Sequence, residues 1–239
     1  MVVMSAEKTV ALVTGANKGI GYEIAAGLGA LGWRVGVGAR DDTRRDEAVE
    51  KLRADGVDAF GVRLDVTDEA SVAGAAASLD RLDVLVNNAG VTGGADQRPT
   101  EASIDAMRAA IEVNVFGVVR VTNAMLPLLR RSAHPRIVVV SSSVGSLTRQ
   151  LAGQAGSVLM AYSPSKTYLN GVVVQYVREL ADTNIKINLV CPGYVATDLN
   201  GFAGHRSVAQ GAAIAVEMAQ VPDDGPTGGF VDDAGPIPW

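Results

Sequence analysis

Hydrophobic positions along the chain fall into short apolar runs that are separated by longer stretches with helical spacing. The runs are continuous and rich in valine, without the polar–apolar alternation of half-exposed strands. This pattern is typical of parallel strands that are covered on both faces. It predicts strands at Thr9–Val13, Arg34–Ala39, Ala59–Leu64, Val84–Val86, Arg136–Val140, Lys186–Val190 and Gly229–Val231.

Helical patterns fill the intervals between these strands. They predict helices at Ile20–Leu31, Thr43–Ala54, Glu69–Ser78, Ser103–Arg131, Tyr162–Asp182 and Val208–Gln220. Strict alternation of strand and helix indicates right-handed βαβ crossovers. The predicted fold class is therefore α/β. We expect a single Rossmann-type domain over residues 1–239, with a doubly wound parallel sheet of about seven strands and helices on both faces.

Two irregular stretches, Val91–Pro99 and Pro192–Arg206, follow the fourth and sixth predicted strands. Both are expected at the carboxyl edge of the sheet, because each begins where a parallel strand ends. Ligands of open α/β folds bind at this edge, so functional residues are expected there.

Composition narrows the class of partner without changing the predicted fold. The formal net charge of −5 argues against a nucleic acid or an anionic membrane surface. No run of 18 apolar residues occurs, and Met1–Thr9 lacks the apolar stretch of a signal peptide, so no membrane segment is expected. The single cysteine, Cys191, fits a reducing compartment, and a cytoplasmic location is predicted.

The first predicted strand runs into Thr14 and a glycine-rich turn, which a helix follows. Glycines at this turn (Gly15, Gly19 and Gly21) allow backbone N–H groups to approach a pyrophosphate closely, and the helix N-terminus adds partial positive charge. The alternative is that these glycines serve only the change of direction from strand to helix.

Three motifs in this order resemble the short-chain dehydrogenase/reductase family. They are T-G-x-x-x-G-x-G from Thr14, Asn87-Asn88-Ala89-Gly90 after the fourth strand, and Tyr162-x-x-x-Lys166. The resemblance covers nearly the whole chain, and Asn17-Lys18 with Ala39-Arg40 is most similar to the carbonyl reductase branch. It implies an oxidoreductase that binds a nicotinamide dinucleotide. The implied cofactor-binding residues are Gly15, Asn17, Lys18, Gly19, Ile20, Gly21, Arg40, Asp65, Val66, Asn88, Ala89, Gly90, Tyr162, Lys166, Pro192, Gly193, Val195 and Thr197.

The end of the second predicted strand bears on the choice of nucleotide. Folds that prefer NAD place a carboxylate there, which accepts hydrogen bonds from the ribose 2′-hydroxyl. Here Ala39 and Arg40 occupy this position, and Arg40 and Lys18 can pair with a 2′-phosphate. Asp41 and Asp42 follow directly and could instead reach the ribose. We predict NADP(H) as the cofactor.

Tyr162 and Lys166 are four positions apart, which places them on one face of a helix, one turn apart. A phenol with its reference pKa of about 10 is a poor acid–base group near neutrality, and a neighbouring ammonium is expected to lower that pKa. Pro164 lies between them and is tolerated only in a first turn, so the helix should begin at Tyr162.

The resemblance implies two further catalytic residues. A serine after the fifth strand would hydrogen-bond the substrate oxygen, and Ser142 fits best, with Ser141 and Ser143 as alternatives. Asn114 would hold a water that relays protons to Lys166. The predicted catalytic set is therefore Asn114, Ser142, Tyr162 and Lys166, with Tyr162 as general acid/base.

Ser142 and Tyr162 are 20 positions apart, more than is usual in the family. The extra residues fall in Leu147–Met160. They should extend the rim of a substrate pocket or cover a surface that relatives use to oligomerise, so monomer, dimer and tetramer all stay open. Pocket walls are expected from Val91–Asp96, Val144–Leu147, Tyr194 and Leu199–Phe202, a mostly apolar set, and Asp198–Arg206 is either a mobile lid or a plain surface loop.

These walls predict a small apolar carbonyl or alcohol substrate: a ketone, an aldehyde or a quinone. Two alternatives are a non-catalytic NADP(H) sensor of the same fold and an enzyme acting on nucleotide sugars. No metal is expected, since His134, His205 and Cys191 are too few and too scattered for a zinc site.

Overall fold

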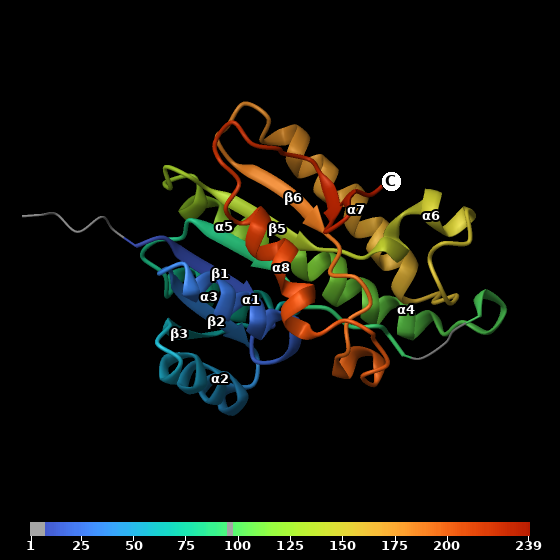
Figure 1. The fold of residues 1–239 in the computed structure, drawn as a ribbon, viewed down its shortest axis with the longest axis horizontal. Helices are drawn as coiled ribbons and strands as arrows, with labels where there is room; N and C mark the ends of the chain where they lie inside the picture. Colours follow the sequence, from blue (N-terminus) through green and yellow to red (C-terminus); the bar gives the residue numbers. More distant parts are fainter. Residues whose placement is uncertain (1–7, 95–97) are drawn as a thin grey trace, which may run out of the picture.

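The computed structural model describes residues 8–94 and 98–239. Its described residues form one eight-stranded sheet in the order β3-β2-β1-β4-β5-β6-β7-β8 (Figure 1). The strands are β1 (Val10–Thr14), β2 (Arg34–Ala39), β3 (Asp58–Arg63), β4 (Val84–Asn87), β5 (Arg136–Val140), β6 (Lys186–Val190), β7 (Phe230–Asp232) and β8 (Gly235–Pro236). The predicted Rossmann-type fold is confirmed.

All the predicted strands are present, and their bounds differ from the prediction by at most one residue. One feature of the sheet differs from the prediction. β8 follows β7 through a tight turn and pairs with it antiparallel, so the sheet is not parallel throughout. A two-residue strand that begins with a glycine and ends with a proline has no hydrophobic pattern from which it could have been predicted.

The helices are α1 (Gly19–Ala30), α2 (Asp42–Ala54), α3 (Glu69–Ala77), α4 (Ile104–Ile111), α5 (Gly117–Leu129), α6 (Leu147–Leu151), α7 (Tyr162–Glu179) and α8 (Val208–Met218). The segment predicted as one helix over Ser103–Arg131 contains α4, a π-helical turn at Glu112–Phe116 and α5. α6 was not predicted.

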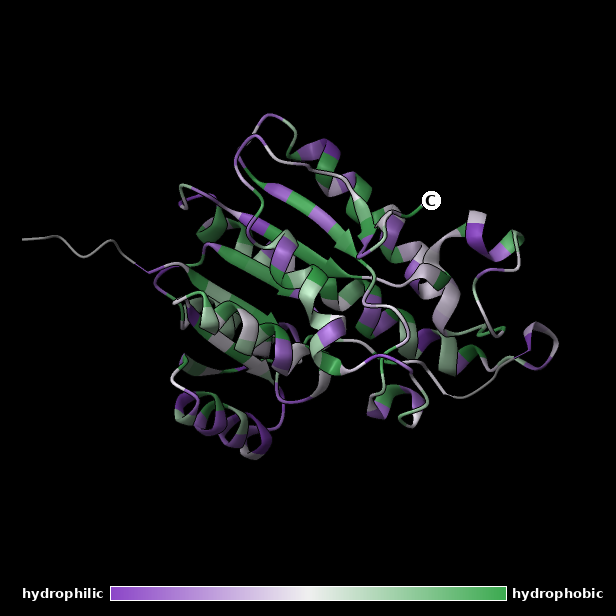
Figure 2. Ribbon diagram, viewed as in Figure 1, coloured by the Kyte–Doolittle hydropathy of each residue, from purple (hydrophilic) through white to green (hydrophobic). Residues whose placement is uncertain are grey.

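Each central strand supplies side chains to two separate cores, because successive residues of a strand point to opposite faces. In β5, for example, Ile137 and Val139 belong to one core and Val138 and Val140 to the other. The core that contains Ile137 is completed by α3, α5 and α7, and the other by α1, α2 and α8. Figure 2 shows the resulting apolar strands inside the molecule and the polar outer surface of α2. The continuous apolar runs of the sequence follow from this two-sided burial.

The segment Ile104–Leu129, with a mean hydropathy of 1.3 over its most apolar window, is long and apolar enough to cross a membrane by length and composition. Core helices of globular proteins meet the same description. Here Val121, Met125 and Leu129 of α5 are fully buried in the core beneath the sheet. The apolar character of the helix is therefore accounted for by packing.

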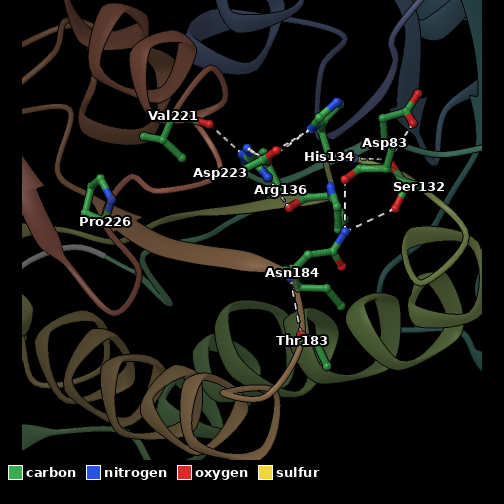
Figure 3. Close-up of polar contacts among 12 residues, drawn as sticks. Asp83, Ser132, His134, Arg136, Thr183, Asn184, Val221, Asp223 and Pro226 are labelled. Carbon is green, nitrogen blue, oxygen red and sulfur yellow. Dashed lines mark hydrogen bonds and ion pairs between the residues drawn. The ribbon is translucent and has the colours of Figure 1, made fainter.

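A polar network joins the amino ends of three strands (Figure 3). Asp83, which is 3% exposed, accepts hydrogen bonds from the Val10 N–H at 2.8 Å and the Ser132 hydroxyl at 2.6 Å. Nearby, the buried Arg136 guanidinium donates to the Val221 carbonyl at 2.7 Å and to Asp223 at 2.7 Å. These bonds tie β1 and β5 to the loops on the side opposite the carboxyl edge.

Replacing Asp83 with alanine should lower the free energy of unfolding by about 3 kcal/mol, because it leaves a buried N–H and a buried hydroxyl without an acceptor. Urea unfolding measures the change. Asp80→Ala, at an exposed position three residues earlier, is the control and should change stability by less than about 0.5 kcal/mol. Equal effects of the two substitutions would contradict the importance of the network.

Candidate functional site at the carboxyl edge of the sheet

The turn between β1 and α1 is shaped for close approach of its backbone. Gly15 and Gly19 have φ angles of +64° and +59°, in the left-handed region that favours glycine. A Cβ at Gly21 would collide with the Asn88 side-chain amide and the Gly15 carbonyl. The Thr14 hydroxyl accepts the Asn88 and Ala89 N–H groups at 2.9 and 3.0 Å, which fixes this turn to the end of β4.

The N-terminus of α1 differs from those of its neighbours. The side chains of Asp41 and Asp68 cap α2 and α3, whereas Lys18 at the start of α1 provides no side-chain cap. The first turn of α1 also contains no acidic residue. Free N–H groups and the positive end of the helix dipole are therefore available to an anion, and the glycine turn leaves room for it. These residues fit the pyrophosphate of a dinucleotide.

Arg40 directly follows β2 and is exposed, and Asp65 lies beside it after β3. Burial raises the pKa of Asp65, but hydrogen bonds from the Thr67 N–H and hydroxyl, together with the charges of Arg40 and Arg120, outweigh it and leave the pKa below its ordinary value. Asp65 is therefore an anion that faces Arg40, and a nucleotide bound here would meet both charges.

The two carboxylates that could have competed for a ribose are engaged elsewhere. Asp41 accepts the Arg44 N–H at 3.0 Å as the cap of α2, and Asp42 pairs with the Arg45 guanidinium. This arrangement leaves the exposed Arg40 directly after β2, with Arg63 opposite Ala39 on the neighbouring strand.

Tyr162 is the first residue of α7, as predicted from Pro164. Its hydroxyl is hydrogen-bonded to Ser142, and the Lys166 ammonium lies 5.7 Å from the centre of its ring. Lys166 also donates to the Val140 carbonyl at 2.9 Å. Three of the four predicted catalytic side chains therefore meet at the carboxyl end of β5.

The acid–base properties of this cluster correct one expectation. We expected the Lys166 ammonium to lower the pKa of Tyr162. Instead burial raises the pKa of Tyr162 to about 12, and the hydrogen bond from Ser142 offsets only part of that effect. Burial also lowers the pKa of Lys166 to about 8. The apolar surroundings penalise both charged forms, so the phenol stays protonated across the neutral range.

The structure distinguishes the three serines after β5. The Ser141 hydroxyl donates to Asn170 at 2.6 Å inside the core, and the Ser143 N–H donates to the Cys191 thiol sulfur at 3.1 Å. Ser142 is partly exposed and hydrogen-bonded to Tyr162. Only Ser142 of the three joins the Tyr162 cluster.

Asn114 is fully buried in the π-helical turn. Its side chain accepts the Val91 N–H at 2.9 Å and donates to the Val91 carbonyl and the Ser165 hydroxyl at 2.8 and 2.9 Å. Ser165 in turn donates to the Tyr162 carbonyl at 2.6 Å. The Asn114 side chain thus connects the loop after β4 to the first turn of α7. Gly90 lies next to it, since a Cβ there would stand 3.3 Å from the Asn114 side-chain oxygen.

The loop after β6 completes the cleft. Gly193, with φ of +76°, turns the chain against Arg206, and Val195 pairs with Arg206. The methyl group of Thr197 stands 3.7 Å from where a Cβ of Gly19 would lie, and Asp198 forms an ion pair with Lys18. The predicted nicotinamide-side loop therefore touches the predicted phosphate turn.

The remaining predicted positions surround this cleft. Asn17, Ile20, Val66 and Pro192 lie in the same turn, helix start and strand ends as their neighbours above. Tyr194, Leu199 and Phe202 are exposed by 50%, 45% and 65%, apolar groups that solvent reaches beside the cleft. Of the expected wall Val91–Asp96, residues 95 and 96 lie outside the described residues.

Three residues in the site were not predicted. Thr14 holds the phosphate turn, Ser165 connects Asn114 to α7, and Cys191 lies close enough to Tyr162 and Lys166 to influence the pKa of both. Thr14 could have been found from its place between a strand and the first glycine of the turn. Ser165 and Cys191 carry no comparable signal.

Comparisons with known proteins agree with this arrangement. The sequence model of the family described as short chain dehydrogenase matches residues 9–207. Short-chain dehydrogenase/reductase 1 of Saponaria officinalis is 35% identical, over 94% of this chain and 94% of its own length. The structure of salutaridine reductase from Papaver somniferum superposes with a TM-score of 0.82 at 30% identity, covering 95% of this chain and all of that one. NADPH-bound carbonyl reductase from chicken fatty liver superposes with a TM-score of 0.85 at 26% identity, covering 98% and 100%.

The buried ammonium predicts a pH-dependent stability. Because the pKa of Lys166 falls from 10.5 in the unfolded chain to about 8 in the fold, the folded protein binds fewer protons between these values. Compared with Lys166→Met, the wild type should gain about 1.4 kcal/mol of unfolding free energy per unit of rising pH in this window. Urea unfolding of both proteins across the window measures the difference. A constant difference would show that the ammonium is not desolvated.

Proposed function

The chain belongs to the short-chain dehydrogenase family, and from this we propose that it is an NADP(H)-dependent carbonyl reductase with Tyr162 as general acid. The observation that carries the proposal is the meeting of three side chains at the end of β5: Lys166 lies 5.7 Å from the Tyr162 ring centre, and Ser142 is close enough to lower the pKa of Tyr162. The N-terminus of α1, which has no side-chain cap, follows β1 at the same carboxyl edge of the sheet. Similar proteins, among them a salutaridine reductase of Papaver bracteatum and a (+)-neomenthol dehydrogenase of Arabidopsis thaliana, support a substrate of the carbonyl/alcohol class.

The bound cofactor would supply a hydride to the carbonyl carbon, and the protein would supply the rest. Ser142 would donate a hydrogen bond to the substrate oxygen and hold it next to the Tyr162 hydroxyl. Tyr162 would give its proton to that oxygen as negative charge develops there, which yields the alcohol. Lys166 would stabilise the phenolate that remains until a proton from solvent replaces the one transferred. The raised pKa keeps the Tyr162 phenol protonated before the reaction but makes it a weaker acid, and the Lys166 ammonium would offset this by stabilising the phenolate.

The proposed cofactor site spans both halves of the sheet. The turn with Gly15, Asn17, Gly19, Ile20 and Gly21 would hold the pyrophosphate at the N-terminus of α1. Arg40, with Lys18 from that turn, would pair with the 2′-phosphate of NADP(H), which also supports this cofactor over NAD(H).

The other contacts complete the proposed site. Asp65, Val66 and the segment Asn88–Gly90 would border the adenosine, and the segment Pro192–Thr197 would border the nicotinamide. Tyr162 and Lys166 would contact the ribose between them. Asn114 would act as a positioning residue through Val91 and Ser165.

We also propose that the substrate is a small apolar ketone, aldehyde or quinone, because the exposed side chains beside the cleft are Tyr194, Leu199 and Phe202. The buried free thiol of Cys191 supports a reducing compartment such as the cytoplasm.

Tyr162→Phe should reduce kcat by about 10³-fold and leave the NADPH dissociation constant within twofold, since only the transferable proton is lost. The measurement follows NADPH absorbance with a panel of ketones, aldehydes and quinones. Tyr168→Phe, on the exposed side of the same helix, is the control and should retain full activity. Turnover retained in Tyr162→Phe would rule out the mechanism, and a wild type that binds NADPH without reducing any substrate would favour a sensor.

Arg40→Ala should raise the KM for NADPH by about 10- to 100-fold, the cost of one charge-assisted contact to phosphate, and leave the KM for NADH unchanged. Arg131→Ala removes the same charge from an exposed position outside the cleft and should alter neither constant. If NADH and NADPH served the wild type equally well, and Arg40→Ala changed neither, the assignment of NADP(H) would be wrong.

A further inference from the structure

The segment that follows Ser142 in the sequence is a short rim, Ser143–Leu151, made of one 3-10 turn and the helix α6. A helix of five residues is not stable in isolation, so its position must be set by contacts with other parts of the protein. Inside the rim, the Gln150 side chain donates to the Val144 carbonyl at 2.7 Å. This bond holds α6 against the turn but does not fix either of them to the sheet.

The contacts that fix α6 come from a distant part of the chain. We call Gly235–Trp239 the strap. The buried Ser146 hydroxyl donates to the Pro238 carbonyl at 2.5 Å, and the Thr148 N–H and hydroxyl both donate to the main-chain oxygen of Trp239, at 3.1 and 2.6 Å. Just before the strap, the Asp232 carboxylate accepts a hydrogen bond from the Arg149 guanidinium at 3.3 Å. Further backbone bonds join α6 to the residues that directly follow it. The turn before α6 is held separately by α7, where the Thr167 hydroxyl and the Asn170 side chain donate to the Gly145 carbonyl at 3.1 and 3.3 Å.

The strap is itself fixed to the sheet. Ile237 is 3% exposed, and its N–H donates to the Phe230 carbonyl at 2.7 Å. The Trp239 ring packs on Phe230 with 5.6 Å between ring centres, and Phe230 pairs with Leu189 of β6. Figure 1 shows the red strap running from the sheet toward α6. A continuous set of contacts therefore leads from β6 through β7 and the strap to the rim.

The rim in turn contacts the proposed catalytic residues. It begins directly after Ser142, and a Cβ at Gly145 would stand 3.0 Å from the Lys166 Cβ, so the rim packs against the first turns of α7. Leu147 and Leu151 project from α6 with 55% and 92% of their surface exposed. Leu147 follows the proposed catalytic Ser142 by five residues, so exposed leucines on α6 are suited to contact an apolar substrate that is large enough to extend past the reacting carbon.

We propose that the strap positions the rim and thereby determines how well bulky apolar carbonyl substrates bind. The proposal rests on the proposed reductase function and adds to it a set of specificity-determining contacts. Substrates that end close to the reacting carbon do not reach α6, so their binding is independent of the strap. The main-chain oxygen of Trp239 is the central contact, since it accepts two hydrogen bonds from Thr148.

The test compares Thr148→Val, which removes the hydroxyl, with Thr148→Ser, which keeps it, and adds Trp239→Ala. For a bicyclic ketone, Thr148→Val and Trp239→Ala should raise KM by about tenfold with kcat within twofold, because binding is lost equally in ground and transition states. For acetone, KM should change by less than about twofold, and the NADPH dissociation constant should not change. Thr148→Ser should match the wild type. Thr183→Val, which also removes a hydrogen-bonded hydroxyl, lies in the loop before β6 and should have no effect on either ketone.

Hydrogen exchange of the α6 amides in the same variants separates this proposal from the proposed function. Faster exchange in Trp239→Ala, together with a KM change confined to the bicyclic ketone, supports it. Unchanged exchange, or equal changes of KM for both ketones, would overturn it. If the wild type reduces no ketone, the reductase assignment fails, and the exchange result alone decides whether the strap holds the rim.

Discussion

The Thr14 hydroxyl accepts two N–H groups from the end of β4, and the rest of the site depends on this contact. β1 and β4 are neighbours in the sheet, but the chain leaves them toward opposite faces, into α1 and toward α4. A crevice must open between two such strands, and in this fold it opens at the carboxyl edge. The threonine hydroxyl holds the glycine turn against the Asn88–Gly90 segment, together with the Asn88 side chain, which donates to the Thr14 and Gly15 carbonyls at 2.9 and 3.3 Å.

The proposed catalytic residues are held in position by their contacts, and their desolvation lowers the stability of the fold. Lys166 and Tyr162 are both desolvated. The lysine amine therefore binds a proton less readily than in water, and the tyrosine phenol releases its proton less readily. The Val140 carbonyl and the Ser142 hydroxyl offset part of this cost. Asn114 satisfies both backbone groups of Val91, which the π-helical turn makes possible by directing its side chain inward.

The sequence was sufficient to predict the helices and strands that carry a regular hydrophobic pattern. It was insufficient for elements whose position depends on a contact with a residue far away in the chain. The strands were predicted because two-sided burial leaves a continuous apolar pattern, and the start of α7 because Pro164 restricts the preceding residues. The π-helical turn and α6 were not, since each depends on contacts between residues far apart in the chain, and β8 is too short to carry a hydrophobic pattern. Asn114 with Val91 and Thr148 with Trp239 are two such pairs.

The same distinction applies to the site. The residues that gather at the carboxyl edge were named from their motifs, and the choice among three serines followed from the resemblance to the family pattern. The direction of the Tyr162 pKa shift was wrong, because spacing along a helix shows that a lysine is near and not how much water has been excluded from both groups. Desolvation depends on the packed surroundings, which no local pattern encodes.

The uncapped start of α1 has a consequence for how the protein persists in a cell. A helix end without its own cap can be completed by an anion that binds there, and such binding stabilises the native state by an amount that rises with the logarithm of the ligand concentration. A ligand present at a hundred times its dissociation constant adds about 2.7 kcal/mol to the free energy of unfolding. Resistance of the chain to proteolysis would then rise with the concentration of an anionic ligand that binds at this helix end.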